Sequence, residues 1–191
     1  TRCFEAGLMP SVTIAVDAFG GDQCPSVEIA AGIQAAREGI GILLVGDENK
    51  IHAKLGAQAS GLPIKIVHAP DVITMDDTPS KAIRGKTEAS MPVCFDLVKQ
   101  GEAQAVVSAG NSGAMLACGL FKYRRIKGVD RPAIVTSFPN AKDAVVLLDM
   151  GANVDCKPIN LVQFAVMGAV YASVYHGKPR PVVGVLSHGS E

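Results

Sequence analysis

The segment LLDMGANVDCKP, residues 147–158, joins an apolar strand to a polar turn and then to a long helix. The strand over residues 144–148 is apolar on both faces, which is typical of a strand inside an α/β sheet. Ligands of open α/β sheets bind beyond the carboxyl ends of the strands. Asp149, Asn153 and Asp155 are therefore candidate site residues. The same two carboxylates also suit Asx-turns or a cap for the following helix.

The rest of the chain alternates apolar strands with helical stretches, and this order predicts an α/β fold. Strands are expected at residues 12–17, 42–46, 64–68, 105–108, 133–138, 145–149 and 182–186. Helices are expected at residues 26–38, 48–59, 79–101 with a break near Pro92, 112–122 and 158–175. The last helix carries apolar residues on opposite sides and is expected to be covered on both. These stripes are Val162, Val166 and Val170, and Ala165, Gly168, Ala169 and Ala172.

Composition indicates a globular protein, because 48% of the 191 residues are hydrophobic and 19% are charged. The charges of the 18 basic and 18 acidic residues cancel, so the chain has no excess of positive charge for binding the nucleic-acid backbone. The five cysteines form no C-x-x-C pair, which favours a reducing compartment and a cytoplasmic protein. We find no membrane span and no signal peptide. Residues 1–11 are expected to be a disordered start or a cloning remnant, and residues 12–191 a single domain that stops early.

A pair of glycines follows the first predicted strand, in the run Asp17-Ala18-Phe19-Gly20-Gly21-Asp22. Glycines let backbone N–H groups approach a ligand closely, so these positions are candidates for a site loop. The run lacks the third glycine of G-x-G-x-x-G and the lysine of a Walker A loop. A tight connection that needs positive φ is the alternative explanation.

A second run of small residues, Ser108-Ala109-Gly110-Asn111-Ser112-Gly113, follows a strand and opens a helix. The free N–H groups at a helix start bind anions, and phosphate is the natural ligand. The alternative is a simple helix cap made by Asn111 or Ser112, although one turn can do both.

The third candidate is the helix that begins after the acidic turn at residues 75–78. Ser80 and Arg84 share a face of this helix, with Lys81 close by. A guanidinium with a hydroxyl one turn away suits a phosphate or a carboxylate. A solvated helix start, with acidic residues favoured by the helix dipole, is the alternative.

Other catalytic patterns are missing from the sequence. There is no G-x-S-x-G elbow, and the four histidines form no triad pattern. No histidines or cysteines have the spacing of metal ligands, so we predict no metal and no cofactor. His188 follows the last predicted strand and is an acid/base candidate.

Taken together, four segments resemble the bacterial phosphate acyltransferases of the PlsX type. They are residues 16–22, the helix after residues 75–78, residues 108–114 and residues 148–156, and the likeness continues to the end of the chain. The resemblance implies a three-layer αβα fold with a mostly parallel sheet, similar to phosphotransacetylase and isocitrate dehydrogenase-like folds. It implies transfer of a fatty acyl group from acyl carrier protein to inorganic phosphate, which gives acyl phosphate for phospholipid synthesis. It further implies a cytoplasmic homodimer that associates peripherally with membrane through a carboxyl-terminal part that this chain lacks.

The sequence also departs from the pattern of this family. Phe19 stands where methionine is usual, Gln23 and Cys24 replace a common His-Gly pair, and Ser112 replaces threonine. If the usual histidine transfers a proton, the Gln23 difference puts that role in doubt.

Hydrogen phosphate is already a nucleophile, so the protein only has to hold it against a thioester and stabilise the oxyanion. We assign anion binding to Ser108, Gly110, Asn111, Ser112 and Gly113, with Ser80, and charge neutralisation to Arg84. Asp149, Asn153 and Asp155 shape the site or handle a proton. Two alternatives stay open: a short-chain phosphotransacylase that uses acyl-coenzyme A, and a non-catalytic anion-binding module.

Overall fold

The computed structural model describes residues 10–186. His188 and most of the expected amino-terminal remnant therefore lie outside the described residues. The chain forms two compact units, Thr1–Arg124 and Arg125–Glu191.

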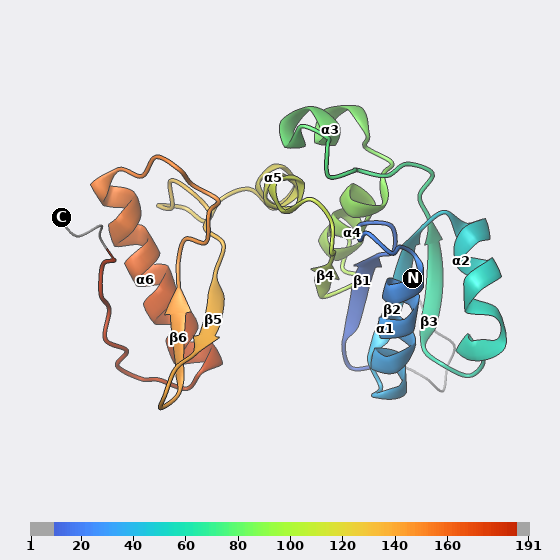
Figure 1. Ribbon diagram of the computed structural model, residues 1–191, viewed down its shortest axis with the longest axis horizontal. Helices are drawn as coiled ribbons and strands as arrows, with labels where there is room; N and C mark the ends of the chain where they lie inside the picture. Colours follow the sequence, from blue (N-terminus) through green and yellow to red (C-terminus); the bar gives the residue numbers. More distant parts are fainter. Residues whose placement is uncertain (1–9, 187–191) are drawn as a thin grey trace. The chain divides into compact units, whose positions relative to one another are not determined.

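The first unit is built on a four-stranded sheet with the order β3-β2-β1-β4 (Figure 1). Its strands are β1 (Thr13–Asp17), β2 (Gly41–Gly46), β3 (Ile64–His68) and β4 (Ala105–Val107), and all neighbours are parallel. The chain moves outward from β1 to β3 and then returns to place β4 on the other side of β1. The strand order reverses between β1 and β4, and this is where open α/β sheets bind ligands. The predicted α/β class is confirmed.

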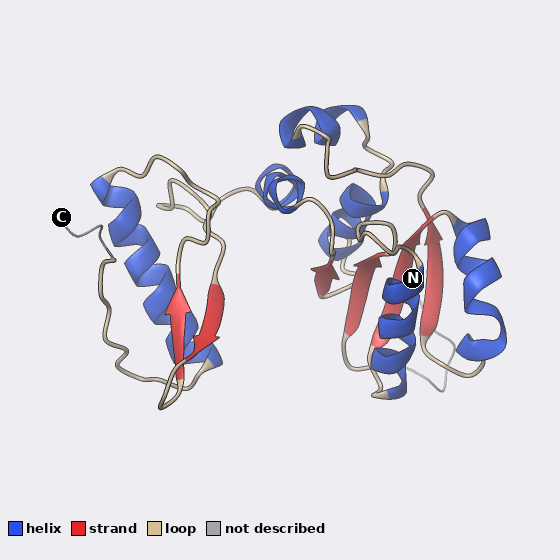
Figure 2. Cartoon of the chain, in the orientation of Figure 1, coloured by secondary structure: helices blue, strands red, loops and turns tan. Residues whose placement is uncertain are grey.

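Helices cover both faces of this sheet (Figure 2). They are α1 (Ser26–Arg37), α2 (Glu48–Leu55) with the short η1 (Gly56–Ala59), α3 (Pro79–Gly85), α4 (Ser90–Lys99) and α5 (Ser112–Tyr123). Ile42 and Leu44 share a core with α1 and α2, whereas Leu43 and Val45 share a second core with α4. Alternate residues of a strand point to opposite faces, so this division gives the three layers of the unit.

The helix predicted at residues 79–101 is interrupted, but not at Pro92. The break lies at residues 86–89, between α3 and α4. Pro92 is buried in the first turn of α4, where a backbone N–H has no partner within the helix. A proline is tolerated there, and the predicted position of the break was wrong for this reason.

The second unit contains a hairpin of β5 (Thr136–Pro139) and β6 (Ala144–Leu147), together with α6 (Pro158–Tyr175). β6 does not lie inside a parallel sheet, as we expected for residues 144–148, because among the described residues it pairs only with β5, in antiparallel. Residues 140–143 form a tight turn closed by the hydrogen bond from Asn140 N to Asp143 O at 2.8 Å. A parallel connection needs a dozen or more residues, so this spacing excludes a parallel pairing between β5 and β6.

The strand predicted at residues 182–186 is wrong, since this segment has no regular structure. Val182 and Leu186 are 99% and 94% exposed. No strand of residues 10–181 pairs with the segment, and an extended segment without a ladder partner is not a strand.

One face of α6 is covered and another is open within the described chain. Phe164 and Ala172 are buried, whereas the valine stripe, which we define as Val162, Val166, Val170 and Val174, is exposed. By length and composition alone, α6 is also the one helix of residues 10–186 that could cross a membrane. The core helix of a soluble protein can have the same length and composition, so these two properties are weak evidence for a membrane span.

Candidate functional site

The turns that follow β1 and β4 are joined by a buried carboxylate. Asp17 is 1% exposed, and its Oδ2 accepts a hydrogen bond from Ser108 Oγ at 2.7 Å. Its Oδ1 accepts from the N–H of Phe19 at 3.3 Å. Ser108 Oγ in turn accepts from the N–H of Gly110 at 3.0 Å. Asp17 therefore sets the geometry of both turns at the point where the strand order reverses.

The turns after β1 and β4 lie so close together at residue 20 that only a glycine fits there. A Cβ atom at Gly20 would lie 2.6 Å from Asp17 Oδ2, 2.7 Å from Ser108 Oγ and 2.9 Å from Gly110 N. Neither Gly20 nor Gly21 has positive φ, so the alternative explanation of a strained connection is wrong. The glycine instead lets the turns after β1 and β4 approach each other closely.

Gly21 lies against a side chain that the sequence did not suggest. An added Cβ at Gly21 would collide with Glu28 Oε1 and would lie 3.4 Å from Ala109 Cβ. Glu28 is only 8% exposed, and its Oε2 has no hydrogen-bond partner among the described residues. In the sequence this acid looks like an ordinary first-turn residue of α1, because nothing local signals its burial. Asp22, in contrast, is exposed.

Asn111 is the N-cap of α5, since its Oδ1 accepts from the N–H of Ala114 at 3.0 Å. Ser112 is the first helical residue and is exposed. The N–H of Gly110 is occupied by Ser108, but the N–H groups of Ser112 and Gly113 donate to no other described residue. Of the predicted anion-binding run, these two N–H groups are among the donors that an anion can use.

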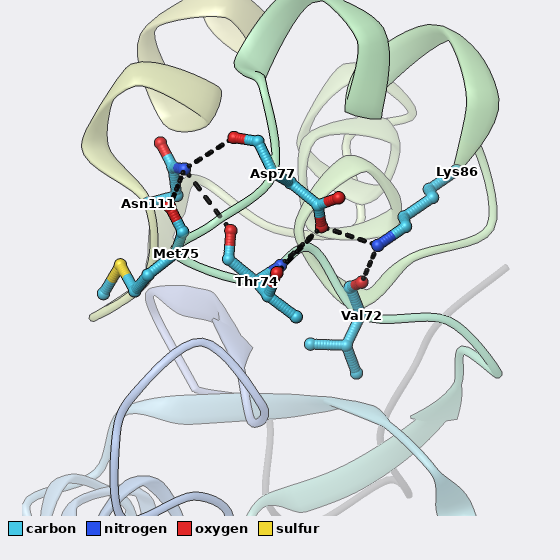
Figure 3. A network of polar contacts seen from close by, with 6 residues as sticks. All are labelled: Val72, Thr74, Met75, Asp77, Lys86 and Asn111. Atoms are coloured by element: carbon cyan, nitrogen blue, oxygen red, sulfur yellow. Dashed lines mark hydrogen bonds and ion pairs between the residues drawn. The ribbon is translucent and has the colours of Figure 1, made fainter.

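The side-chain amide of Asn111 is directed toward the segment before α3 rather than toward open space (Figure 3). Nδ2 lies 3.3 Å from the carbonyl oxygen of Thr74 and 3.2 Å from those of Met75 and Asp77. The sequence predicted a contact with phosphate at this residue, and its side chain is occupied within the protein.

The helix α3 packs on the start of α5. An added Cβ at Gly113 would lie 2.9 Å from Pro79 Cγ, so this glycine also permits a close approach. Ser80 and Arg84 are both exposed. The Arg84 guanidinium lies 5.8 Å from the centroid of the Phe121 ring and makes no ion pair with a described residue. It is therefore a cation that is held by an aromatic ring and open to an anion.

The remaining candidates belong to the second unit, where two of them form a group. Asp149 Oδ1 accepts from the N–H of Ile134 at 2.7 Å, and its Oδ2 accepts from the backbone and side-chain N–H groups of Asn153 at 2.6 and 3.0 Å. Asn153 Nδ2 also donates to Pro132 O at 2.8 Å. These bonds hold the turn after β6 in shape. The Asp155 carboxylate is exposed and unbonded among residues 10–186, although its backbone carbonyl accepts from Arg131.

The thiols and metal-ligating groups give no further site. Burial raises the pKa of Cys94 well above its ordinary value and that of Cys118 to about 11, so neither is a nucleophile at neutral pH. Burial, and then the charge of Glu28, also raises the pKa of Cys24. Cys156 is exposed. Within residues 10–186, no group of three or more His, Cys, Asp or Glu side chains could hold a metal ion.

Comparisons with known proteins agree on one family. The family model described as "Fatty acid synthesis protein" matches residues 12–191. A phosphate acyltransferase of Syntrophotalea carbinolica is 54% identical over 182 residues, which cover 94% of this chain and 52% of that protein. The phosphate acyltransferase of Geobacter sulfurreducens is 53% identical over 180 residues, covering 93% and 52%. The chain thus spans about half the length of the curated relatives it matches.

Proposed function

Because the chain belongs to the fatty acid synthesis protein family, we propose that it is part of a phosphate acyltransferase. The full-length protein transfers a fatty acyl group from acyl carrier protein to inorganic phosphate, and the acyl phosphate enters phospholipid synthesis. The names of the relatives support the reaction class. The acyl carrier protein as donor rests on the sequence resemblance.

The observation that carries this proposal is the joined pair of turns after β1 and β4. Asp17 and Ser108 fix the turns, and the N–H groups of Ser112 and Gly113, which donate to no described residue, lie at the start of α5. A helix start with free N–H groups favours a bound phosphate. Arg84, on the helix that packs beside α5, supplies a positive charge for the same ligand.

In the proposed reaction an oxygen of hydrogen phosphate attacks the thioester carbonyl carbon, and the carbon–sulfur bond breaks. The proton of hydrogen phosphate ends on the departing sulfur, so the products are acyl phosphate and a thiol. The protein holds the nucleophile in place and stabilises the tetrahedral oxyanion, and each preorganised donor is worth about 3 to 4 kcal/mol of barrier. Asp149 and Asn153 hold the turn after β6 in shape, and with Asp155 they are assigned to shaping the site or handling a proton.

We further propose that the full-length protein is a cytoplasmic homodimer that associates peripherally with membrane. The exposed valine stripe of α6 supports a covering partner, since exposed apolar stripes on helices mark interaction surfaces. The membrane contact is assigned to a part of the protein beyond this chain.

The test is release of free thiol from acyl carrier protein by the full-length protein, with and without inorganic phosphate. We expect release only when phosphate is present. Equal release in both conditions, or an acyl adduct on Ser108 or Cys156 in a mass spectrum, overturns the mechanism. Acetyl-coenzyme A in place of the long-chain donor tests the short-chain alternative. Phosphate binding without any thiol release indicates the non-catalytic module.

A further inference from the structure

The Asn111 side chain uses all of its polar atoms inside the protein. Its Oδ1 caps α5 through the N–H of Ala114, and its Nδ2 faces the carbonyl oxygens of Thr74, Met75 and Asp77 (Figure 3). A side-chain amide has two N–H donors, so three acceptors leave no donor for a ligand. Asn111 therefore connects the anion-binding turn to residues 74–77, which lie 34 to 37 positions earlier in the chain.

The segment that Asn111 holds is fixed from its other side by an ion pair. Asp77 Oδ2 lies 2.6 Å from Lys86 Nζ and accepts from the N–H and the hydroxyl of Thr74 at 2.8 and 3.2 Å. Lys86 Nζ also donates to the carbonyl of Val72 at 3.0 Å. Lys86 thus closes residues 72–77 into a loop by bonding to Val72 and to Asp77, and Asn111 binds the same loop from the opposite side (Figure 3).

We propose that Asn111 is a positioning residue that couples the loop of residues 72–77 to the phosphate-binding turn. The proposal deepens the proposed function and rests on it for its kinetic consequence. The N–H groups of Ser112 and Gly113 immediately follow Asn111, so their direction depends on where this side chain is held. Phosphate meets these N–H groups, whereas the Asn111 amide meets only protein. The loop of residues 72–77 therefore controls phosphate affinity without contacting phosphate.

Asn111→Ser in the full-length protein separates the two contacts of this side chain, the cap of α5 and the hydrogen bonds to residues 74–77. Serine is as good an N-cap as asparagine and adds no charge, but it cannot reach residues 74–77. Lys86→Met loosens the same loop from the far end, at a residue that has no contact with the turn of residues 108–113. Asp47→Ser is the matched control, because Asp47 caps α2 by the same contact that Asn111 makes in α5 and makes no hydrogen bond to described residues of segments 72–77 or 108–113.

We expect Asn111→Ser and Lys86→Met each to raise the KM for phosphate about tenfold, with the KM for the acyl donor unchanged. In the double variant the rise in the phosphate KM should be smaller than the product of the two single effects, because both changes release the same loop. Asp47→Ser should leave both KM values unchanged. An equal rise in both KM values, or an unchanged phosphate KM in Lys86→Met, overturns the coupling.

Amide hydrogen exchange tests the coupling without relying on activity. The hydrogen-bonded N–H groups of Thr74 and Asp77 should exchange about tenfold faster in Asn111→Ser than in the wild type. A raised phosphate KM with unchanged exchange at residues 74–77 means that Asn111 contacts phosphate directly, which contradicts the proposal. If the wild-type protein shows no phosphate-dependent thiol release, the proposed function fails, and the exchange result alone decides whether the coupling exists.

Discussion

The hydroxyl of Ser108 donates a 2.7 Å hydrogen bond to Oδ2 of Asp17, across 91 positions of sequence. The bond is possible because β4 returns to pair with β1, which places the ends of the two strands next to each other. Asp17 is almost completely buried, and a buried carboxylate needs hydrogen-bond donors. Ser108 supplies one of them and, by accepting from Gly110, also orders the second turn.

Ser108→Ala removes this donor and leaves both Asp17 Oδ2 and the N–H of Gly110 without their partner. We expect the free energy of unfolding to fall by about 1 to 3 kcal/mol, the usual cost of a buried polar group left unpaired. Denaturant unfolding measures the change. Ser60→Ala is the control, because Ser60 is exposed and bonds only through its backbone, and it should have no effect. Equal stabilities for the two variants would show that the Asp17 contact contributes nothing.

Gly20→Ala places a methyl group where Asp17, Ser108 and Gly110 already meet. Because two of the three neighbours belong to the other turn, the turns must separate, and we expect a loss of about 1 to 3 kcal/mol with a loss of phosphate binding. Gly85→Ala is the matched control, since nothing lies within 4 Å of its added Cβ. Thermal unfolding and phosphate titration measure both effects. A fully stable Gly20→Ala protein with normal phosphate binding would contradict the close approach.

Arg84→Ala should weaken phosphate use far more than folding. Among residues 10–186 the guanidinium lies over the exposed ring of Phe121 and makes no ion pair, so the cost in stability should be about 0.5 to 1 kcal/mol, typical of an exposed cation–π pair. The phosphate KM should rise markedly. Lys81→Ala, an exposed cation on the same helix, is the comparison. A collapse of the melting temperature with unchanged phosphate dependence would indicate a purely structural role for Arg84.

Stability should depend on pH through Asp77. The hydrogen bond from the Lys86 ammonium, and then that from the Thr74 backbone, lowers the pKa of Asp77 below its ordinary value. A carboxyl whose pKa is lower in the folded state adds stability above its unfolded pKa of about 3.9, and this stability is lost as the pH falls through the folded value. Asp77→Asn should therefore be less stable than the wild type at pH 6, and the difference should shrink below about pH 4. If the difference in unfolding free energy between Asp77→Asn and the wild type stays constant down to pH 3, protonation of Asp77 does not contribute to the pH dependence of stability.

The valine stripe of α6 should serve self-association of the full-length protein rather than folding of the second unit. Val166 is 59% exposed, whereas Phe164 is 4% exposed. We expect Val166→Asp, and the half-buried Ala169→Asp, to shift the molar mass from dimer to monomer in light scattering, because a buried unpaired charge costs several kcal/mol at an interface. Phe164→Asp should instead abolish soluble folding. Soluble Val166→Asp and Ala169→Asp variants with unchanged mass and stability would show that the stripe is exposed in the whole protein as well.

Local sequence patterns were enough to predict the strands and helices of the first unit and the turns that carry the site. The strands are short apolar runs bounded by turn residues, and helix residues recur every three to four positions, so each element is identified without knowledge of its neighbours. The pattern failed for the break between α3 and α4, where Pro92 is tolerated in the first turn of a helix and a long-range contact also contributes, and for the strand at residues 182–186. The interruption of residues 79–101 lies at residues 86–89, where Ser90 N bonds to Asp71 O, and residues 182–186 lack a described strand to pair with.

The α/β class, the glycine turns after β1 and β4, the cap of α5 and the family resemblance could all be predicted from the sequence, because each depends on residues that are close together in the chain. Which of these residues contact one another follows from the fold. The contacts of Ser108 with Asp17 and of Asn111 with Thr74 join segments 91 and 37 positions apart, and the burial of Glu28 against Gly21 depends on how the first turn lies over α1. Such contacts follow from the strand order and the packing of helices on the sheet, and no local period encodes either.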